Sequence, residues 1–251
     1  MSEVVTSENL AEFNAQRLGL ANEPETVVVA EPTEPVEEKV ESEPEIPVME
    51  DGAGNLIIMP PPQPEVKFRK VGLIGDVDEE KSAELIQGLY GLKELGRFEI
   101  PPATKRSKPK IGYDPIDFII STHGGSASDM FAIYDVMRDV QSDGCEIQTF
   151  GVGKVMSAGV LLLAAGTKGK RKIGKHCRVM MHSVIGGNSG PIFNLENEMS
   201  EIRATQERYI NALKTETKMT IKQINNFFNR HVDIYLSAEE AVKLGIADIV
   251  V

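Results

Sequence analysis

The stretch that most constrains the fold is residues 151–166, Gly-Val-Gly-Lys-Val-Met-Ser-Ala-Gly-Val-Leu-Leu-Leu-Ala-Ala-Gly. An apolar, strand-like run ends there in two glycines, Gly151 and Gly153. The segment after Ser157 is rich in Ala and Leu and carries no charge, which is typical of a helix that is buried on all sides. These residues therefore predict a strand, a glycine-bearing turn and a buried helix, with Ser157 at the turn.

A serine at such a turn has two possible roles. The first free N–H groups of a helix favour negative charge, so the turn suits a serine nucleophile whose reaction produces an oxyanion. Serine is also one of the residues that commonly cap the N-terminus of a helix. The turn by itself does not distinguish the two roles. They differ in what they require elsewhere in the sequence, because only a nucleophile needs a base and donors for an oxyanion.

Strands alternate with helices along the body of the chain, which predicts an α/β layered fold with a mostly parallel sheet. Between two of these elements, residues 97–114 break the pattern and are predicted to form an exposed basic loop or a loose hairpin. The predicted strands cover about 70–75, 116–121, 145–151, 170–173, 178–182 and 247–251, and the predicted helices cover about 76–95, 127–141, 158–165, 191–218, 220–230 and 237–244.

Residues 1–66 form a separate leader. They contain 15 acidic and two basic residues, and nine of the chain's 14 prolines. Acidic, proline-rich sequence with few aromatics cannot bury enough apolar surface to offset the entropy cost of ordering, so we predict a disordered leader. The folded body is then residues 67–251. A cleaved or regulatory propeptide is the alternative interpretation of the leader.

The composition excludes several classes of protein. The whole chain has a net charge of −11 and the leader −13, so the body sums to +2 and lacks the basic face of a nucleic-acid binder. The only cysteines, Cys145 and Cys177, lie in apolar contexts, which argues against a disulfide scaffold and for a reducing compartment, the cytoplasm. No run approaches the roughly 18 apolar residues of a membrane helix, and the N-terminus lacks the features of a secretory signal.

A second glycine-bearing turn follows the predicted strand 116–121, at His123-Gly124-Gly125-Ser126. It is not a phosphate-binding loop, because no Gly-Lys-Ser/Thr follows. A pair of glycines lets the backbone approach a bound group closely and direct N–H donors at it. Sites in α/β sheets gather beyond the carboxyl ends of the strands. The two turns together would therefore supply a nucleophile, Ser157, and an oxyanion hole.

A serine nucleophile needs a base, and the base needs a group that orients it. Of the four histidines, His182 closes an apolar strand 25 positions after Ser157, and a βαβ-type return can bring it beside the serine. His231 lies in a polar segment typical of a surface. Asp233 is a candidate for the orienting carboxylate, because it precedes an apolar run and a capped helix. A structural strand-end histidine and an ordinary turn aspartate are the alternatives.

Five ordered blocks with compatible spacing resemble the proteolytic subunits of the ATP-dependent Clp protease, a family of self-compartmentalised serine peptidases. The resemblance covers about residues 68–251. The blocks are Ile119-Ile-Ser-Thr-His-Gly-Gly-Ser-Ala, Phe131-Ala-Ile-Tyr-Asp-Val-Met, Gly153-Lys-Val-Met-Ser-Ala-Gly with Leu161-Leu-Leu-Ala-Ala-Gly-Thr-Lys-Gly-Lys-Arg, Arg178-Val-Met-Met-His, and Asp233-Ile-Tyr-Leu-Ser-Ala-Glu-Glu-Ala-Val-Lys-Leu-Gly-Ile-Ala-Asp.

The resemblance implies a Clp/crotonase-like layered fold of repeated ββα units with a protruding handle helix at about 191–218. It implies a nucleophile at Ser157, a base at His182 and an orienting acid at Asp233. The backbone N–H groups of Gly125, Gly124 and Ala158 would form the oxyanion hole. In that family seven subunits form a ring, two rings enclose a chamber, and an AAA+ ATPase feeds in unfolded polypeptides. ATP is used by that partner, and the subunit itself is expected to need no cofactor or metal.

The sequence also departs from the family pattern, which indicates a divergent member and is compatible with a phage origin. His123 replaces a proline, Ala158 replaces a methionine, His231-Val232 replaces an Asp-Arg pair used in ring-to-ring contact, and residues 97–114 are an insertion. Three alternatives therefore stay open. They are a phage head-maturation protease of the same fold, a catalytically silent structural subunit of a mixed ring, and a crotonase-like acyl-CoA enzyme, for which the sequence lacks a separate acidic pair.

Overall fold

The computed structural model describes residues 48–50, 56–58, 68–102, 108–230 and 232–251. Within the predicted leader it describes only a short antiparallel hairpin, in which β1 (Val48–Glu50) pairs with β2 (Leu56–Ile58). The sequence analysis did not anticipate this hairpin. The other leader residues lie outside the described part of the chain, so the disorder predicted for them stays a prediction.

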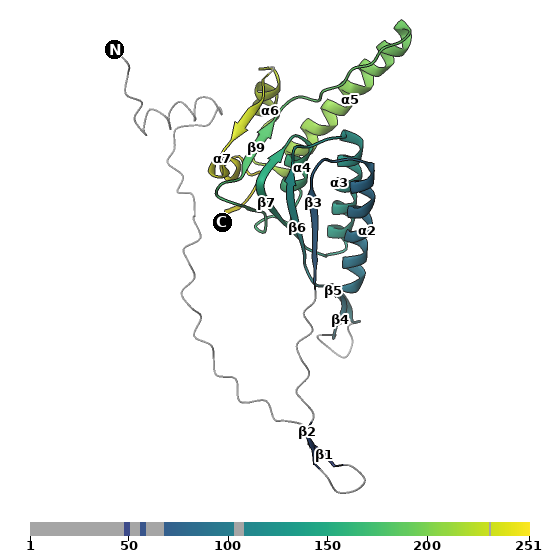
Figure 1. Cartoon of the computed structure of the whole chain (residues 1–251), viewed down its shortest axis with the longest axis vertical. Helices are drawn as coiled ribbons and strands as arrows, with labels where there is room; N and C mark the ends of the chain where they lie inside the picture. Colours follow the sequence, from purple (N-terminus) through teal and green to yellow (C-terminus); the bar gives the residue numbers. More distant parts are fainter. Residues whose placement is uncertain (1–47, 51–55, 59–67, 103–107, 231) are drawn as a thin grey trace, which may run out of the picture. The chain divides into compact units, whose positions relative to one another are not determined.

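A seven-stranded, mostly parallel sheet forms the centre of the unit Arg69–Val251. Figure 1 shows its strands β9, β7, β6 and β3 side by side. Its main path runs β10-β9-β7-β6-β3, with parallel pairing except between β9 and β10, and the short strands β8 and β11 extend it from β7. The strands are β3 (Lys70–Ile74), β6 (Ile116–Thr122), β7 (Ile147–Met156), β8 (Lys172–Ile173), β9 (Arg178–Met181), β10 (Ile234–Leu236) and β11 (Ile249–Val250).

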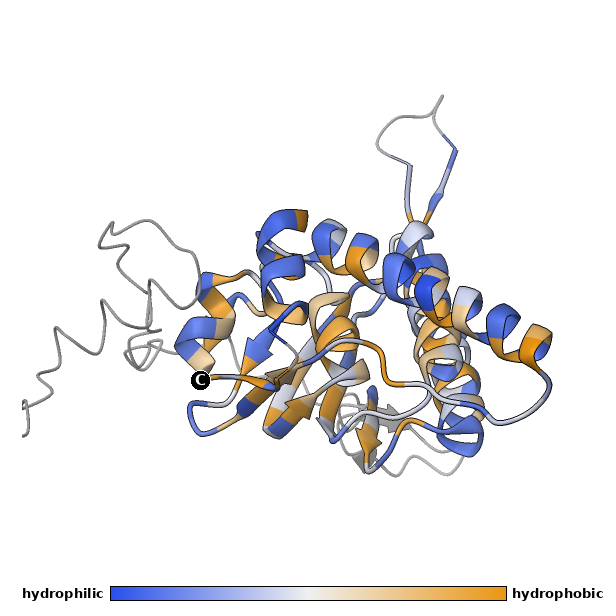
Figure 2. Ribbon diagram, turned by 90° about the horizontal axis from the view of Figure 1, so that it is seen from above, coloured by the Kyte–Doolittle hydropathy of each residue, from blue (hydrophilic) through white to orange (hydrophobic). Residues whose placement is uncertain are grey.

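Helices cover this sheet, which confirms the predicted α/β layered fold. Figure 2 shows apolar residues concentrated in the central strands, with polar and apolar residues alternating along the covering helices. The helices are α2 (Glu79–Leu95), α3 (Ala127–Ser142), α4 (Ala158–Ala164), α5 (Ile192–Glu216), α6 (Ile221–Phe228) and α7 (Ala238–Lys243). Of the two alternatives predicted for 97–114, a basic loop or a loose hairpin, the structure shows the hairpin, with β4 (Arg97–Ile100) antiparallel to β5 (Lys110–Tyr113).

The glycines at 151 and 153 do not end their strand, contrary to the sequence-based prediction. Strand β7 continues to Met156, because Gly153 adopts a φ of 65° and lets the strand bend without stopping. Before the bend, β7 pairs with β8 at Phe150 and Gly151, and after it with β9 at 154–156. The bend therefore brings the end of β9 beside the turn at Ser157.

Helix α4 is buried at every one of its seven positions, as its composition predicts. Leu161, Leu162 and Leu163 are fully buried, and each such side chain contributes about 1.5–3 kcal/mol relative to exposure. The helix is thus fixed in the core, and the turn that leads into it has little freedom to move.

The long helix α5 confirms the predicted handle and projects beyond the sheet (Figure 1). Its first turns expose large apolar side chains, among them Phe193 and Met199, whereas its last turns bury Tyr209, Leu213 and Glu216. One half of the helix therefore packs in the body while the other half stands free of it in the described chain.

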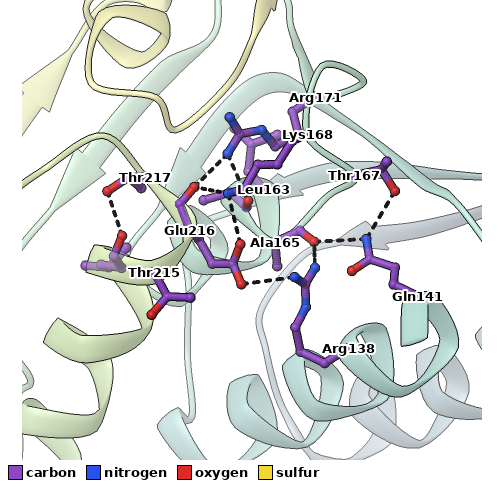
Figure 3. Close-up of polar contacts among 12 residues, drawn as sticks. Arg138, Gln141, Leu163, Ala165, Thr167, Lys168, Arg171, Thr215, Glu216 and Thr217 are labelled. Atoms are coloured by element: carbon purple, nitrogen blue, oxygen red, sulfur yellow. Dashed lines mark hydrogen bonds and ion pairs between the residues drawn. The ribbon is translucent and has the colours of Figure 1, made fainter.

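A buried charge cluster at Glu216 anchors the packed end of α5 (Figure 3). The Glu216 side chain is 2% exposed and forms ion pairs with Arg138 from α3, at 3.1 Å, and with Lys168 from the loop after α4, at 2.9 Å. The guanidinium of Arg171 donates to the backbone carbonyl of Glu216 at 2.8 Å and also pairs with Asp248. The end of the handle is thereby tied to α3, to the loop after α4 and to the C-terminal segment.

Replacing Glu216 with Gln is expected to lower the free energy of unfolding by about 3 kcal/mol, because it removes the negative charge that neutralises the cations around it. This value is at the lower end for a broken buried pair, since Arg138 and Lys168 are partly exposed to water. Urea unfolding measures the change. Glu201→Gln, which breaks the exposed pair with Arg208, is the matched control and should cost less than about 1 kcal/mol. Equal losses in the two variants would contradict the anchoring role.

Candidate active site

Ser157 lies between β7 and α4 in a strained backbone conformation. Its φ is 53° and its ψ −120°, and it is the only non-glycine with positive φ among the described residues. Such a conformation is unfavourable for a residue with a side chain and persists only when the surrounding structure holds it. The Ser157 side chain makes no capping hydrogen bond with α4. Ser157 therefore occupies the N-cap position of α4 without capping the helix through its side chain, and its hydroxyl faces another group.

That group is His182, which directly follows β9. The two ends meet because β7 and β9 are parallel and in register, with Met156 opposite Met180. The backbone N–H of Ser157 donates to the carbonyl of Met180 at 2.8 Å, and the His182 Nε2 atom lies 2.9 Å from the Ser157 Oγ atom. The predicted pair of serine and histidine thus comes together at the carboxyl edge of the sheet.

The second ring nitrogen of His182 determines which tautomer is present. Its Nδ1 atom lies 2.5 Å from the backbone carbonyl oxygen of Ser183, which can only accept a hydrogen bond. In the neutral ring the proton is therefore assigned to Nδ1, and Nε2 is left to accept the hydrogen bond of the Ser157 hydroxyl. This is the tautomer that a general base for Ser157 requires.

Asp233 directly precedes β10, the strand that pairs with β9 ahead of His182. Strands β9 and β10 are antiparallel, and their pairing ends with Ile234 opposite Met181, the chain neighbours of Asp233 and His182. The Asp233 side chain is exposed to solvent. No hydrogen bond joins it to His182 in the described part of the chain, where Ser183 occupies Nδ1 instead. The assignment of Asp233 as the orienting acid therefore stays a prediction.

The glycine turn after β6 is held against the segment that leads into α2. Val77 donates its N–H to the carbonyl of Gly124 and accepts from the N–H of Ser126, both at 2.8 Å, which forms a bridge beside Gly125. A Cβ atom on Gly125 would lie 2.1 Å from the Val77 carbonyl oxygen. Only glycine therefore fits at position 125.

Gly124 packs directly on the serine. Its φ is 104°, and a Cβ atom there would lie 2.5 Å from the Ser157 Cβ and 3.0 Å from its Oγ. The Gly124 N–H donates to the Thr122 hydroxyl at 2.9 Å. Gly124 is therefore not a free donor, which corrects the prediction that its N–H belongs to an oxyanion hole. Because Gly124 has no side chain, it leaves room for the side chain of Ser157.

Two backbone N–H groups beside Ser157 have no protein acceptor in the described part of the chain. One belongs to Gly125. The other belongs to Ala158, which opens α4, where the first N–H groups have no intrahelical partner. These two groups are the predicted donors that remain candidates for binding an oxyanion.

A cavity of about 360 Å³ opens beside these groups. Its wall includes both members of the Ser157–His182 pair, the glycine turn and apolar side chains from α3 and α5. His123, which replaces the family's proline, also lines it. A concave, mostly apolar space with a few convergent polar groups is the usual form of a binding site.

Tyr209 is a site residue that the sequence analysis missed. It was assigned only to the apolar pattern of the handle helix, yet its hydroxyl donates to the backbone carbonyl of Ser157 at 3.0 Å. The two residues are 52 positions apart, so no local sequence signal indicates the contact. Only the packing of α5 against α4 brings them together.

The described residues reveal no other reactive centre. Within them, no group of three or more His, Cys, Asp or Glu side chains is arranged to hold a metal ion. Cys145 and Cys177 are free thiols in the core, and burial raises the pKa of Cys177 to about 11. Helices long and apolar enough to cross a membrane are absent from the described ranges.

Comparison with known proteins matches residues 109–251 to the Clp protease family. The chain is 38% identical over 131 residues to ATP-dependent Clp protease proteolytic subunit 1 of Prochlorococcus marinus subsp. pastoris, which covers 52% of this chain and 64% of that protein. It is 35% identical over 136 residues to proteolytic subunit 2 of Chlamydia pneumoniae, covering 54% and 64% respectively. The chain thus spans slightly less than two thirds of the length of these relatives.

The matched region begins later than the resemblance seen in the sequence, which starts near residue 68. Strand β3 and helix α2 precede the matched stretch, although β3 pairs with β6 in the same sheet. The matched region contains Ser157, His182, Asp233, the glycine turn and the handle helix. Because the family model matches more than half of its residues, this chain belongs to the Clp protease family.

Proposed function

We propose that this chain is a serine endopeptidase that hydrolyses peptide bonds in unfolded polypeptides. The observation that carries the proposal is the 2.9 Å contact between the His182 Nε2 and the Oγ of Ser157 at a strained turn. An ordinary structural serine would not need such a backbone, whereas a nucleophile gains exposure and a fixed direction from it. Membership of the Clp protease family supports the same chemistry.

The reaction follows from this geometry. Ser157 Oγ attacks the peptide carbonyl carbon while His182 Nε2 takes its proton. The carbonyl oxygen becomes an oxyanion and receives hydrogen bonds from the N–H groups of Gly125 and Ala158. His182 then gives its proton to the leaving amine, and an ester remains on Ser157. Water, deprotonated by His182, hydrolyses this ester and restores the free serine.

Asp233 is proposed as the acid that orients His182. The cavity wall contains no carboxylate among the described residues. Support for Asp233 comes from the pairing of its neighbour Ile234 with Met181, the residue before His182. In the reaction it would accept from Nδ1 in place of the Ser183 carbonyl and stabilise the imidazolium that forms. A bound peptide would add as an extended strand beside the glycine turn at 124–126.

The assembly is proposed from the exposed half of the handle helix. Apolar side chains on α5, including Ile192, Phe193 and Met199, are half or more exposed in the single chain, and a cluster of this kind marks a surface that another protein covers. We propose that copies of this chain cover it in a heptameric ring or double ring, inside which hydrolysis takes place. An AAA+ unfoldase would use ATP to supply the polypeptide, and the peptidase subunit itself would bind no cofactor or metal.

A catalytically silent subunit of a mixed ring is the second candidate function. The observation that favours it is that no hydrogen bond joins Asp233 to His182 in the described part of the chain. A histidine without its acid is a poor base. A phage head-maturation protease with a removable leader shares the proposed chemistry and differs in its substrate. The match to the Clp protease family gives no support to a crotonase-like acyl-CoA enzyme.

Replacing Ser157 with Ala is expected to reduce hydrolysis of a short fluorogenic peptide by about 1,000-fold or more, since the nucleophile is lost while the fold is retained. A short peptide needs no unfoldase, so the test isolates the chemistry. Ser142→Ala, at an exposed position on α3, is the matched control and should keep wild-type turnover. Equal turnover in Ser157→Ala and wild type would contradict the proposal.

Replacing Asp233 with Asn is expected to lower kcat on the order of 100-fold with a smaller change in KM, because the amide cannot stabilise an imidazolium. Steady-state kinetics on the same peptide measure both constants. Asp135→Asn, at an exposed position on α3, provides the control. If wild type hydrolyses the peptide and Asp233→Asn does so equally well, Asp233 is not the orienting acid.

Replacing Gly124 with Ala is expected to abolish activity, because the new methyl group collides with Ser157 and displaces it. Gly144→Ala is the matched control, since Gly144 also has a positive φ, 91°, but no atoms lie within 4 Å of its virtual Cβ. Both variants should lose about 1–2 kcal/mol of stability through backbone strain, measured by thermal unfolding. Only Gly124→Ala should lose turnover, and an active Gly124→Ala would show that Ser157 is not confined there.

A further inference from the structure

Tyr209 is a buried side chain that the proposed mechanism does not use. It is 5% exposed, and its hydroxyl donates to the backbone carbonyl of Ser157 at 3.0 Å. Burial raises the pKa of this hydroxyl above its usual range, so it stays protonated and acts as a donor. A tyrosine hydroxyl from the handle helix therefore touches the backbone of the proposed nucleophile itself.

We propose that Tyr209 is a positioning residue for the oxyanion hole, acting through the peptide group that joins Ser157 to Ala158. The inference rests on the proposed peptidase function of this site. The carbonyl of Ser157 and the N–H of Ala158 belong to one planar, trans peptide group and point in opposite directions. A hydrogen bond that fixes the direction of the carbonyl therefore also fixes the direction of the N–H.

The strain at Ser157 makes such a constraint necessary. The direction of this peptide group depends on the Ser157 ψ angle of −120°, which together with a φ of 53° is an unfavourable combination for a residue with a side chain. The N–H of Val160, in the first turn of α4, also donates to the Ser157 carbonyl, at 3.0 Å. Tyr209 adds a second donor from another element, and a hydrogen bond to a carbonyl also strengthens the N–H of the same peptide as a donor.

Tyr209 is itself held rigidly. Its ring stacks on Phe228 of α6, with ring centroids 5.8 Å apart and an angle of 7° between the planes. This packing does not involve the hydroxyl. The hydroxyl can therefore be removed while the ring, its stacking and its part of the cavity wall remain. The hydrogen bond to Ser157 can thus be tested separately from the packing of the handle helix.

The test is Tyr209→Phe in the full chain. We expect kcat for a fluorogenic peptide to fall about tenfold with KM changed less than about twofold, because the donor acts on the transition state and the Val160 hydrogen bond remains. The rate of covalent labelling by a fluorophosphonate should fall by a similar factor, since its phosphoryl oxygen occupies the same hole.

Tyr134→Phe is the matched control. Its hydroxyl donates to Glu216 at 2.9 Å, and Tyr134, unlike Tyr209, does not line the cavity beside Ser157. It should lower the thermal stability while leaving kcat and labelling unchanged. The inference is overturned if Tyr209→Phe has the same kcat and the same rate of fluorophosphonate labelling as wild type. It is also overturned if Tyr134→Phe lowers kcat and the labelling rate by as much as Tyr209→Phe does. A wild-type chain that labels no faster than Ser157→Ala would instead overturn the peptidase function, and the role of Tyr209 with it.

Discussion

The left-handed backbone conformation of Ser157 is the constraint on which the site depends. A residue with a side chain adopts it only under external restraint, and each neighbouring element supplies part of that restraint. Helix α4 is fixed in the core, and the bend at Gly153 brings β7 alongside β9. Tyr209 holds the carbonyl that follows the strained bond. The conformation turns the serine hydroxyl away from the helix that it would otherwise cap and towards His182.

The parallel sheet brings the other residues of the site to the strained serine. Strands β6, β7 and β9 end at one edge, so the glycine turn, Ser157 and His182 meet although they lie far apart in the chain. Gly124 leaves the space for Ser157, and Gly125 allows the close approach of Val77. Asp233 directly precedes the antiparallel strand β10, whose pairing with β9 begins only at Ile234. The acid is therefore the least constrained member of the proposed triad.

Much of this arrangement could be predicted from the sequence, because it depends on local patterns. The apolar run after Ser157 predicted a buried helix, the glycine pair predicted a turn, and the strand before His182 predicted its position at the same edge. The continuation of β7 through Gly151 and Gly153 could not be predicted, since a glycine in a strand can mark a bend or an end. The contacts of Tyr209 and Glu216 arise from packing across 45 or more residues, and no local pattern records them.

The central claim is that His182 activates Ser157 for covalent attack. The most direct measurement treats the chain with a fluorophosphonate and locates the adduct by peptide mass spectrometry, in wild type and in His182→Ala. The account predicts one adduct, on Ser157, that forms at least about 100-fold more slowly without the histidine. An adduct on another residue, or one that forms on Ser157 equally fast in His182→Ala, would contradict it.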